Sequence, residues 1–149
     1  MREVPSPLPY RLKNRRKRIK TKVLVIEDNE QNLYLVTFIL EKQGFEVIQA
    51  RDGRNGIEMA KKNTPDLILL DIQLPGMDGY AVARELKNNM GKKDIPIIAV
   101  TSYAMVGDRE KALEAGCTGY IKKPINPVTF ISEIVQHLPN QSSEGAKET

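Results

Sequence analysis

Short apolar runs alternate with longer amphipathic segments along most of this chain, and this alternation restricts the fold more than any other sequence feature. Five runs have the length and aliphatic composition of strands, and a segment with apolar residues at helical spacing follows each one. Strict alternation implies a parallel sheet with right-handed crossovers. We therefore predict an α/β fold, a doubly wound five-stranded parallel sheet flanked by five helices. The expected strands lie at 23–26, 45–50, 66–70, 97–100 and 119–121, and the expected helices at 29–43, 54–63, 80–89, 106–115 and 127–138.

The first expected helix illustrates the pattern. Gly44 is expected to end it, because glycine commonly follows the last helical turn. Its apolar residues at helical spacing are Leu33, Val36, Phe38, Ile39 and Leu40.

Charge is divided unevenly along the chain, and this division suggests three regions. Residues 1–22 contain nine Lys or Arg residues and one acid, whereas residues 23–149 contain 14 Lys or Arg residues and 18 acids. The overall pI of about 9.2 is therefore no evidence that the folded part binds nucleic acid. We predict a basic flexible leader at 1–21, a folded domain at 22–138 and a disordered tail at 139–149.

The basic run at 11–20 has two interpretations. It is either a solvated tail or a weak electrostatic contact with nucleic acid, an anionic membrane surface or an acidic partner. The run lacks interleaved aromatic residues and any helix-turn-helix pattern, so we expect no sequence-specific DNA binding.

Membrane-spanning and secreted proteins do not fit this sequence. No apolar run approaches the roughly 18 to 20 residues of a membrane span, and the N-terminus lacks the apolar core of a secretory signal. Cys117 is the only cysteine, so no disulfide can form within the chain. These features predict a cytoplasmic protein in a reducing environment.

Asp71 follows the apolar run 67–70 and precedes Pro75 and Gly76. A run of this composition indicates a strand that is buried on both faces. In open α/β sheets, ligands bind outside the carboxyl ends of the strands, which is where this carboxylate falls. A charge in such a place is costly unless it is paired or holds a metal. We interpret Asp71 as a ligand, a nucleophile or both.

Three further expected strands also end in polar side chains. Because these strand ends share one edge of a parallel sheet, acids, small hydroxyls and an ammonium group are expected to gather at one site. Three carboxylates repel one another, and a hard cation such as Mg²⁺ relieves that repulsion. Carboxylate, Mg²⁺, lysine and hydroxyl together suit phosphoryl transfer to a carboxylate. The three strand ends are Glu27-Asp28, Thr101-Ser102 and Lys122-Lys123-Pro124.

With these residues the chain resembles the receiver domains of two-component response regulators, and the resemblance spans residues 22–138. It implies the flavodoxin-like receiver fold. The stretch from Thr101 to Arg109 is especially similar to stand-alone cell-cycle regulators and to receiver modules of hybrid histidine kinases. The matching pieces are 23–28, 67–79, 100–102 and 119–124.

The resemblance implies a role for each residue at the acidic end of the site. Asp71 matches the phosphoacceptor. Asp28 matches the acid that binds Mg²⁺ directly, and Glu27 matches the second acid, which often acts through water. Gln73 matches the position whose main-chain carbonyl is a metal ligand.

Other matching residues are implied to respond to phosphorylation. Thr101 matches the switch hydroxyl, and Tyr120 matches the aromatic rotamer switch, with plain packing as the alternative for Tyr120. Lys123 matches the family's active-site lysine, and its peptide bond to Pro124 is expected to be cis.

Three positions bear on the choice of partner and on the rate of dephosphorylation. Lys122 stands where the similar regulators commonly have Glu, so the reversed charge leaves the partner open. Gln73 and Tyr103 match positions that shape dephosphorylation rates in the family, and we expect Tyr103 to hinder the attacking water and prolong the phosphorylated state.

Taken together, these features predict a single-domain response regulator that takes a phosphoryl group from the phosphohistidine of a histidine kinase or histidine phosphotransfer protein. We expect it to be a signalling protein whose only catalysis is its own phosphotransfer and dephosphorylation. About ten residues follow Leu138, so output is expected through contacts with a downstream protein target, or the chain acts as a phosphate relay. A homodimer is a further candidate assembly.

Two alternatives belong to other classes. An aspartate-nucleophile phosphatase would want a second aspartate two residues after Asp71, where Gln73 stands. A receiver-like scaffold that is not phosphorylated would be expected to lack one of the acids or the lysine, and none is missing.

Overall fold

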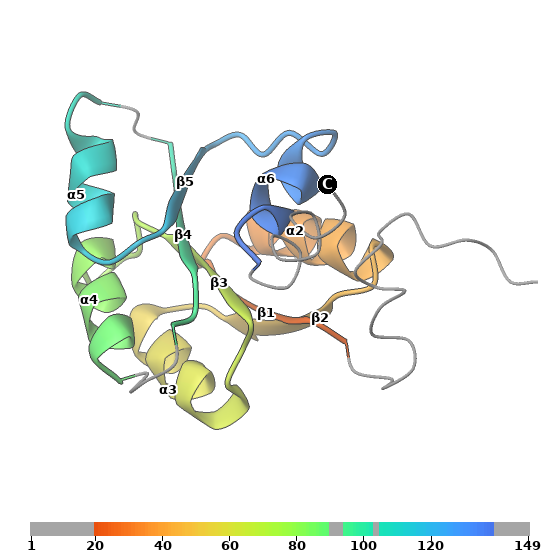
Figure 1. The fold of residues 1–149 in the computed structure, drawn as a ribbon, viewed down its shortest axis with the longest axis horizontal. Helices are drawn as coiled ribbons and strands as arrows, with labels where there is room; N and C mark the ends of the chain where they lie inside the picture. Colours follow the sequence, from red (N-terminus) through yellow and green to blue (C-terminus); the bar gives the residue numbers. More distant parts are fainter. Residues whose placement is uncertain (1–19, 90–93, 103–104, 139–149) are drawn as a thin grey trace, which may run out of the picture.

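The structure is a computed structural model, and it describes residues 20–89, 94–102 and 105–138. Within them lie five strands and five helices in alternation (Figure 1). Most of the predicted leader, the predicted tail and Tyr103 lie outside the described residues. The strands are β1 (Lys22–Ile26), β2 (Glu46–Ala50), β3 (Leu67–Asp71), β4 (Ile97–Thr101) and β5 (Gly119–Lys122). The helices are α2 (Glu30–Lys42), α3 (Gly53–Asn63), α4 (Gly79–Asn89), α5 (Asp108–Glu114) and α6 (Phe130–Val135).

All strand pairs in the sheet are parallel, in the order β2-β1-β3-β4-β5. The chain therefore starts near the middle of the sheet, winds to one edge and then returns to build the other. Helices α2 and α6 cover one face, and α3, α4 and α5 cover the other (Figure 1). The predicted doubly wound α/β fold is confirmed.

Two apolar cores result from the side-chain alternation of the strands. In β3, Ile68 and Leu70 point to the α3–α4–α5 side, and Leu67 and Leu69 point to the α2–α6 side. All five β3 residues are buried, as expected for a central parallel strand. Asp71 is the last of them, so the strand ends one residue later than predicted.

The predicted apolar positions of the first helix need one correction. Leu33, Val36, Ile39 and Leu40 are buried, but Phe38 is 51% exposed. Phe38 lies on the outer face of α2, where its ring stacks on that of Tyr34 with 6.4 Å between centroids. Residues four apart meet on a helix surface, so this aromatic pair can form without the core.

The last helix is shorter than predicted. Asn126 forms a turn in which its side chain accepts from Val128 N–H and its carbonyl accepts from Thr129 N–H, so the helix begins only at Phe130. The helix 106–115 likewise shortens to Asp108–Glu114, because Gly107 has a φ of 94° and the Asp108 side chain accepts from Met105 N–H. Among the described residues, no helix is long and apolar enough to cross a membrane.

Candidate functional site

The carboxyl ends of four strands meet at one edge of the sheet, as predicted. Ile26 pairs with Leu70, and Asp71 pairs with Val100 in the neighbouring strand. Thr101 in turn pairs with Lys122. This register brings Glu27, Asp28, Asp71, Thr101 and Lys123 to the same end of the molecule.

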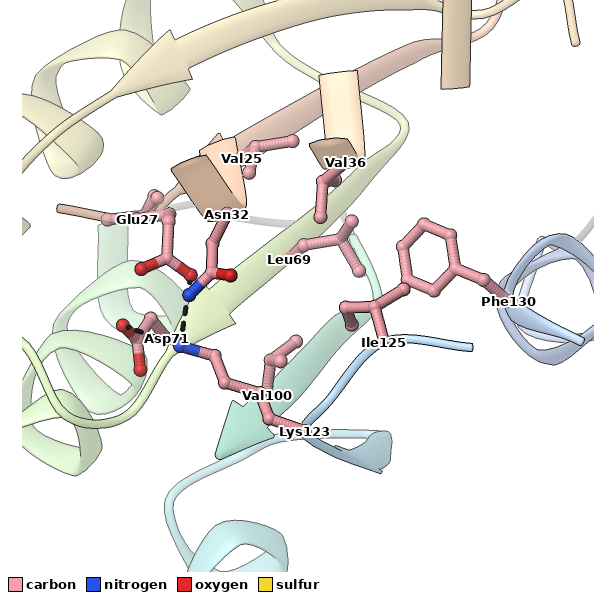
Figure 2. A pocket seen from close by; sticks show the side chains of 11 residues that line it. Val25, Glu27, Asn32, Val36, Leu69, Asp71, Val100, Lys123, Ile125 and Phe130 are labelled. Atoms are coloured by element: carbon pink, nitrogen blue, oxygen red, sulfur yellow. Dashed lines mark hydrogen bonds and ion pairs between the residues drawn. The ribbon is translucent and has the colours of Figure 1, made fainter. Parts of the chain in front are cut away.

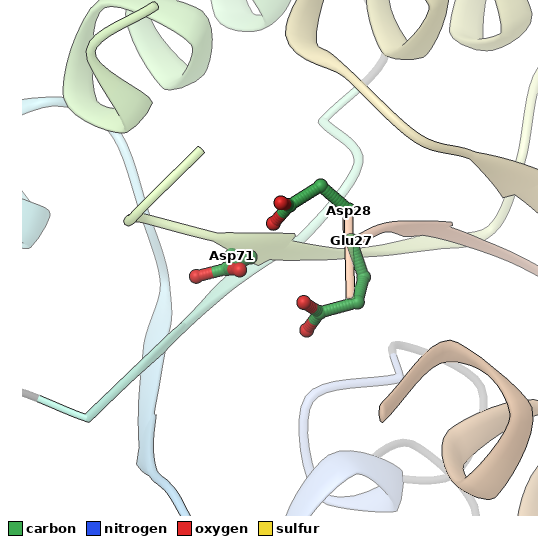
Figure 3. Close-up of side chains that lie close together, drawn as sticks. All are labelled: Glu27, Asp28 and Asp71. Atoms are coloured by element: carbon green, nitrogen blue, oxygen red, sulfur yellow. The ribbon is translucent and has the colours of Figure 1, made fainter. Parts of the chain in front are cut away.

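Three carboxylates cluster there (Figure 3). One oxygen from each of Glu27, Asp28 and Asp71 lies within 4.8 Å of the others. Glu27 and Asp71 are 5% and 3% exposed, whereas Asp28 is exposed. Two buried acids and one exposed acid thus face a common point that solvent reaches from one side.

Lys123 lies between the two buried acids. Its ammonium nitrogen is 3.2 Å from Glu27 Oε1 and 3.3 Å from Asp71 Oδ2. Figure 2 shows the side chain of Lys123, the residue directly after β5, reaching toward both carboxylates. The Lys123–Pro124 peptide bond is cis, as the resemblance implied.

The surroundings of this ion pair are mostly apolar. The side chains that line the space behind it come from β1, β3, β4, α2, α6 and the segment after β5 (Figure 2). An apolar wall favours the neutral form of a carboxyl group. The apolar lining residues include Val25, Val36, Leu69, Val100, Ile125 and Phe130.

Glu27 shows the effect of that wall. Burial, followed by the charge of Asp71 and a hydrogen bond with it, raises the pKa of Glu27 to about 7. The ammonium of Lys123 and the hydrogen bond from Asn29 N–H act in the opposite direction. Without a cation in the cluster, Glu27 is therefore partly protonated at neutral pH.

We expect the raised pKa of Glu27 to make the unfolding free energy of the metal-free protein depend on pH. The raised pKa means that the folded state binds more protons than the unfolded chain between the usual carboxyl value of 4.5 and about 7. The stabilisation is complete below 4.5 and is lost as the pH rises through 7. Glu27→Gln removes this dependence, so its unfolding free energy relative to wild type should rise by up to about 3 kcal/mol over that interval.

Urea unfolding in EDTA across this pH range measures the difference. Glu46→Gln is a matched control, because Glu46 is exposed at the start of β2. Stability curves of wild type and Glu27→Gln that run parallel from acid to neutral pH would contradict the expectation.

Gln73 joins Asp71 to the end of β4. Its backbone N–H donates to Asp71 Oδ1 at 2.9 Å. Its side-chain oxygen accepts from the Thr101 hydroxyl at 3.2 Å and from Ser102 N–H at 2.6 Å. The side-chain contacts were not predicted, because the resemblance gave this residue a main-chain metal ligand and an influence on dephosphorylation rates but no partner at the end of β4.

Asn32 also lines the site and was not singled out in the sequence. It lies in the first turn of α2, where its N–H donates to the side chain of Asn29, the N-cap residue. The sequence offered one signal for Asn32: it is a polar residue in the first turn of the predicted helix, on the same side as Leu33 and Val36. Tyr120, by contrast, is not among the residues that line this pocket and is half-buried against the α3–α4–α5 core.

A family model that matches most of the chain identifies the proteins that share this site. The model of the response regulator receiver domain matches residues 23–135, which is more than half of the chain. This chain belongs to the response regulator receiver domain family. Receivers act in two-component signalling, so the chain is a signalling protein of that class.

Curated relatives of this receiver include polar-differentiation response regulators. It is 43% identical to the regulator DivK of Brucella anthropi over 116 residues, which cover 78% of this chain and 94% of that protein. DivK of Brucella abortus gives the same identity and coverage. The especially close similarity to stand-alone cell-cycle regulators, inferred from the sequence, agrees with these relatives.

Solved receivers share the fold. A CheY-like receiver from Methanospirillum hungatei has a TM-score of 0.77 at 29% identity and covers 85% of this chain and 99% of its own. The receiver of a sensor histidine kinase from Pseudomonas aeruginosa, described with a magnesium ion in its active-site cleft, has a TM-score of 0.72 at 33% identity. The latter comparison covers 80% of this receiver and 98% of that chain.

Proposed function

We propose that this receiver accepts a phosphoryl group on Asp71 from a phosphohistidine of a histidine kinase or histidine phosphotransfer protein. The observation that carries the proposal is the position of Asp71. It is a nearly inaccessible carboxylate at a strand end, bound by Lys123 and adjoined by two further acids. A buried acid surrounded in this way suits a nucleophile whose added charge is neutralised by its neighbours.

The transfer forms one bond and breaks one. An oxygen of Asp71 attacks phosphorus, the bond from phosphorus to the histidine nitrogen breaks, and the imidazole leaves with the electron pair. Lys123 lies 3.3 Å from Asp71 Oδ2 and neutralises part of the charge that arrives. The Gln73 N–H, already bonded to Asp71 Oδ1, fixes the carboxylate plane for the attack.

The acidic cluster fits Mg²⁺. Its donors are all oxygens, and hard cations of this kind bind one or two carboxylates together with water. We propose Glu27, Asp28, Asp71 and the main-chain carbonyl of Gln73 as the residues that hold it. When bound, the ion would neutralise charge on the carboxylates and on the phosphoryl oxygens. The similar receiver from Pseudomonas aeruginosa, with magnesium coordinated in its active-site cleft, supports this proposal.

Output is proposed to pass through Thr101 and Tyr120 to the face formed by α5, β5 and α6. Thr101 lies at the site and pairs with Lys122, and Tyr120 lies two residues before Lys122 in that adjacent strand, opposite Ala99. A cavity of about 400 Å³ opens on that face, and Lys122 and His137 are among its lining residues. We propose that this face binds a downstream protein or a second copy of the receiver, in the cytoplasm.

The two alternatives find less support. Gln73 offers no carboxylic acid to protonate a leaving group, which a phosphatase of the aspartate-nucleophile type needs. A scaffold has no use for the paired contacts of Lys123 with Glu27 and Asp71, which bury charge at a cost.

Beryllofluoride binding tests the proposal directly. Because this anion mimics a phosphoryl group on a carboxylate, we expect it to bind in the presence of Mg²⁺ and not in EDTA. Amide resonances from the ends of β3, β4 and β5 should shift together in a titration followed by NMR. Binding that is absent with Mg²⁺, or identical in EDTA, would count against phosphorylation of Asp71 and favour the scaffold.

A further inference from the structure

Two hydrogen-bond donors at the end of β4 are held by one neutral oxygen. Ser102 N–H and the Thr101 hydroxyl both donate to Gln73 Oε1, at 2.6 Å and 3.2 Å. A backbone N–H can only donate, so the Gln73 amide must present its oxygen, and not its nitrogen, to this pair. The two hydrogen bonds join Gln73 to residues that are 28 and 29 positions later in the sequence.

The same two donors stand beside the acceptor carboxylate. Val100 pairs with Asp71, so Thr101, the last residue of β4, and Ser102 directly after the strand follow the position opposite the acceptor. A phosphoryl group on Asp71 brings three strong acceptor oxygens to this place, and charged acceptors form stronger hydrogen bonds than a neutral amide. The amide of Gln73 and such a group therefore compete for Thr101 and Ser102.

We propose that the side chain of Gln73 is a latch that holds the end of β4 in the unphosphorylated receiver and must release it before the phosphoryl group is bound. The proposal rests on the proposed function of Asp71. It makes Gln73 a positioning residue that acts through Thr101 and Ser102. Part of the binding free energy of the anion is spent on opening the latch, which lowers its apparent affinity.

Gln73→Met tests the latch. Methionine keeps the length of the side chain but lacks the carbonyl oxygen, and the main-chain carbonyl is unchanged. We expect beryllofluoride with Mg²⁺ to bind roughly fivefold to tenfold more tightly to this variant, the effect of one net hydrogen bond that no longer has to be broken. Before the anion is added, the Ser102 amide resonance should differ between the variant and wild type, and the two should converge at saturation.

Gln49→Met is the matched control. The Gln49 amide donates to the Thr37 hydroxyl at 3.0 Å, in an exposed contact between β2 and α2. This control makes the same substitution and also breaks a bond to a threonine, but at a distance from the acidic cluster. Its beryllofluoride affinity should stay within about twofold of wild type.

The outcomes separate the latch from the function on which it rests. Equal or weaker binding by Gln73→Met would overturn the latch and leave phosphorylation of Asp71 standing. If neither wild type nor the variant binds the anion, the proposed function fails and the latch falls with it. Gln73→Ala, which deletes the side chain beyond Cβ, must change the affinity in the same direction, so a packing defect specific to methionine cannot produce the result.

Discussion

Asp71→Asn is expected to abolish phosphorylation. The donor is acetyl phosphate or a phosphorylated histidine kinase, with Mg²⁺ present. Phosphoryl incorporation should fall by roughly 1000-fold or more, because the neutral amide of asparagine does not act as a nucleophile toward phosphorus. Intact-protein mass spectrometry detects the added phosphoryl group directly. The substitution keeps the shape of the buried side chain, so the site stays filled.

The unfolding free energy of Asp71→Asn shows whether the loss of phosphorylation is caused by misfolding. Asp71 raises the pKa of Glu27 by its charge and its hydrogen bond, so removing that charge relieves a repulsion. We expect the metal-free variant to unfold with a free energy equal to wild type or about 1 kcal/mol higher near neutral pH. Loss of phosphorylation accompanied by a large loss of stability would not support a nucleophile.

Asp66→Asn provides the matched control. Asp66 is exposed directly before the start of β3, where its side chain accepts from the backbone N–H of Lys22 at 2.8 Å. The variant should accept the phosphoryl group as wild type does. If Asp71→Asn were still phosphorylated, another residue would have to be the acceptor. If Asp66→Asn also lost phosphorylation, the loss would not be specific to Asp71.

Lys123→Met is expected to have the largest effect on stability. It removes the ammonium that lies 3.2 Å from Glu27 and 3.3 Å from Asp71 and leaves two buried carboxylates facing each other. Breaking a buried ion pair from one side costs about 3 to 5 kcal/mol. We expect a loss of that order in urea unfolding at about pH 8 in EDTA, together with weaker beryllofluoride binding.

The pH dependence of this loss identifies its cause. Lys123 lowers the pKa of Glu27, so the variant should protonate Glu27 more readily than wild type. The folded state then takes up a proton as the pH falls, and the destabilisation should shrink toward about pH 5. A loss of equal size at both pH values would indicate lost packing and contradict the electrostatic explanation.

Lys122→Met is the control for Lys123→Met. Lys122 is the adjacent residue in β5 and is exposed, so the same substitution there changes the net charge by the same amount. Surface changes of this kind usually alter stability by less than about 0.5 kcal/mol. The comparison separates the loss of the Lys123 contacts from the effect of a change in net charge.

Much of the architecture could be predicted because its causes are local. Buried parallel strands demand continuous apolar runs, and the crossovers demand amphipathic helices between them. Asp71, Thr101 and the acids at 27 and 28 were identified because the ends of parallel strands share one edge. That inference needs only the order of elements, and the register confirmed it.

Other features depend on packing that the spacing does not specify. Helical spacing placed Phe38 with the apolar residues of α2, but the outer face of the helix offered it Tyr34 as a partner and Lys42 at 5.5 Å over its ring. The start of α6 depended on the turn at Asn126. The side-chain contacts of Gln73 join segments whose relative position only the folded sheet defines.

The register of the sheet has a further consequence for the lifetime of the protein in a cell. Asp71 and Lys123 lie 52 positions apart, so they meet only when the sheet between them has formed. Any ion or group that binds at this edge selects the folded chain and lowers the population of unfolded molecules that proteases degrade. We therefore expect a ligand that occupies this edge to slow degradation of the receiver.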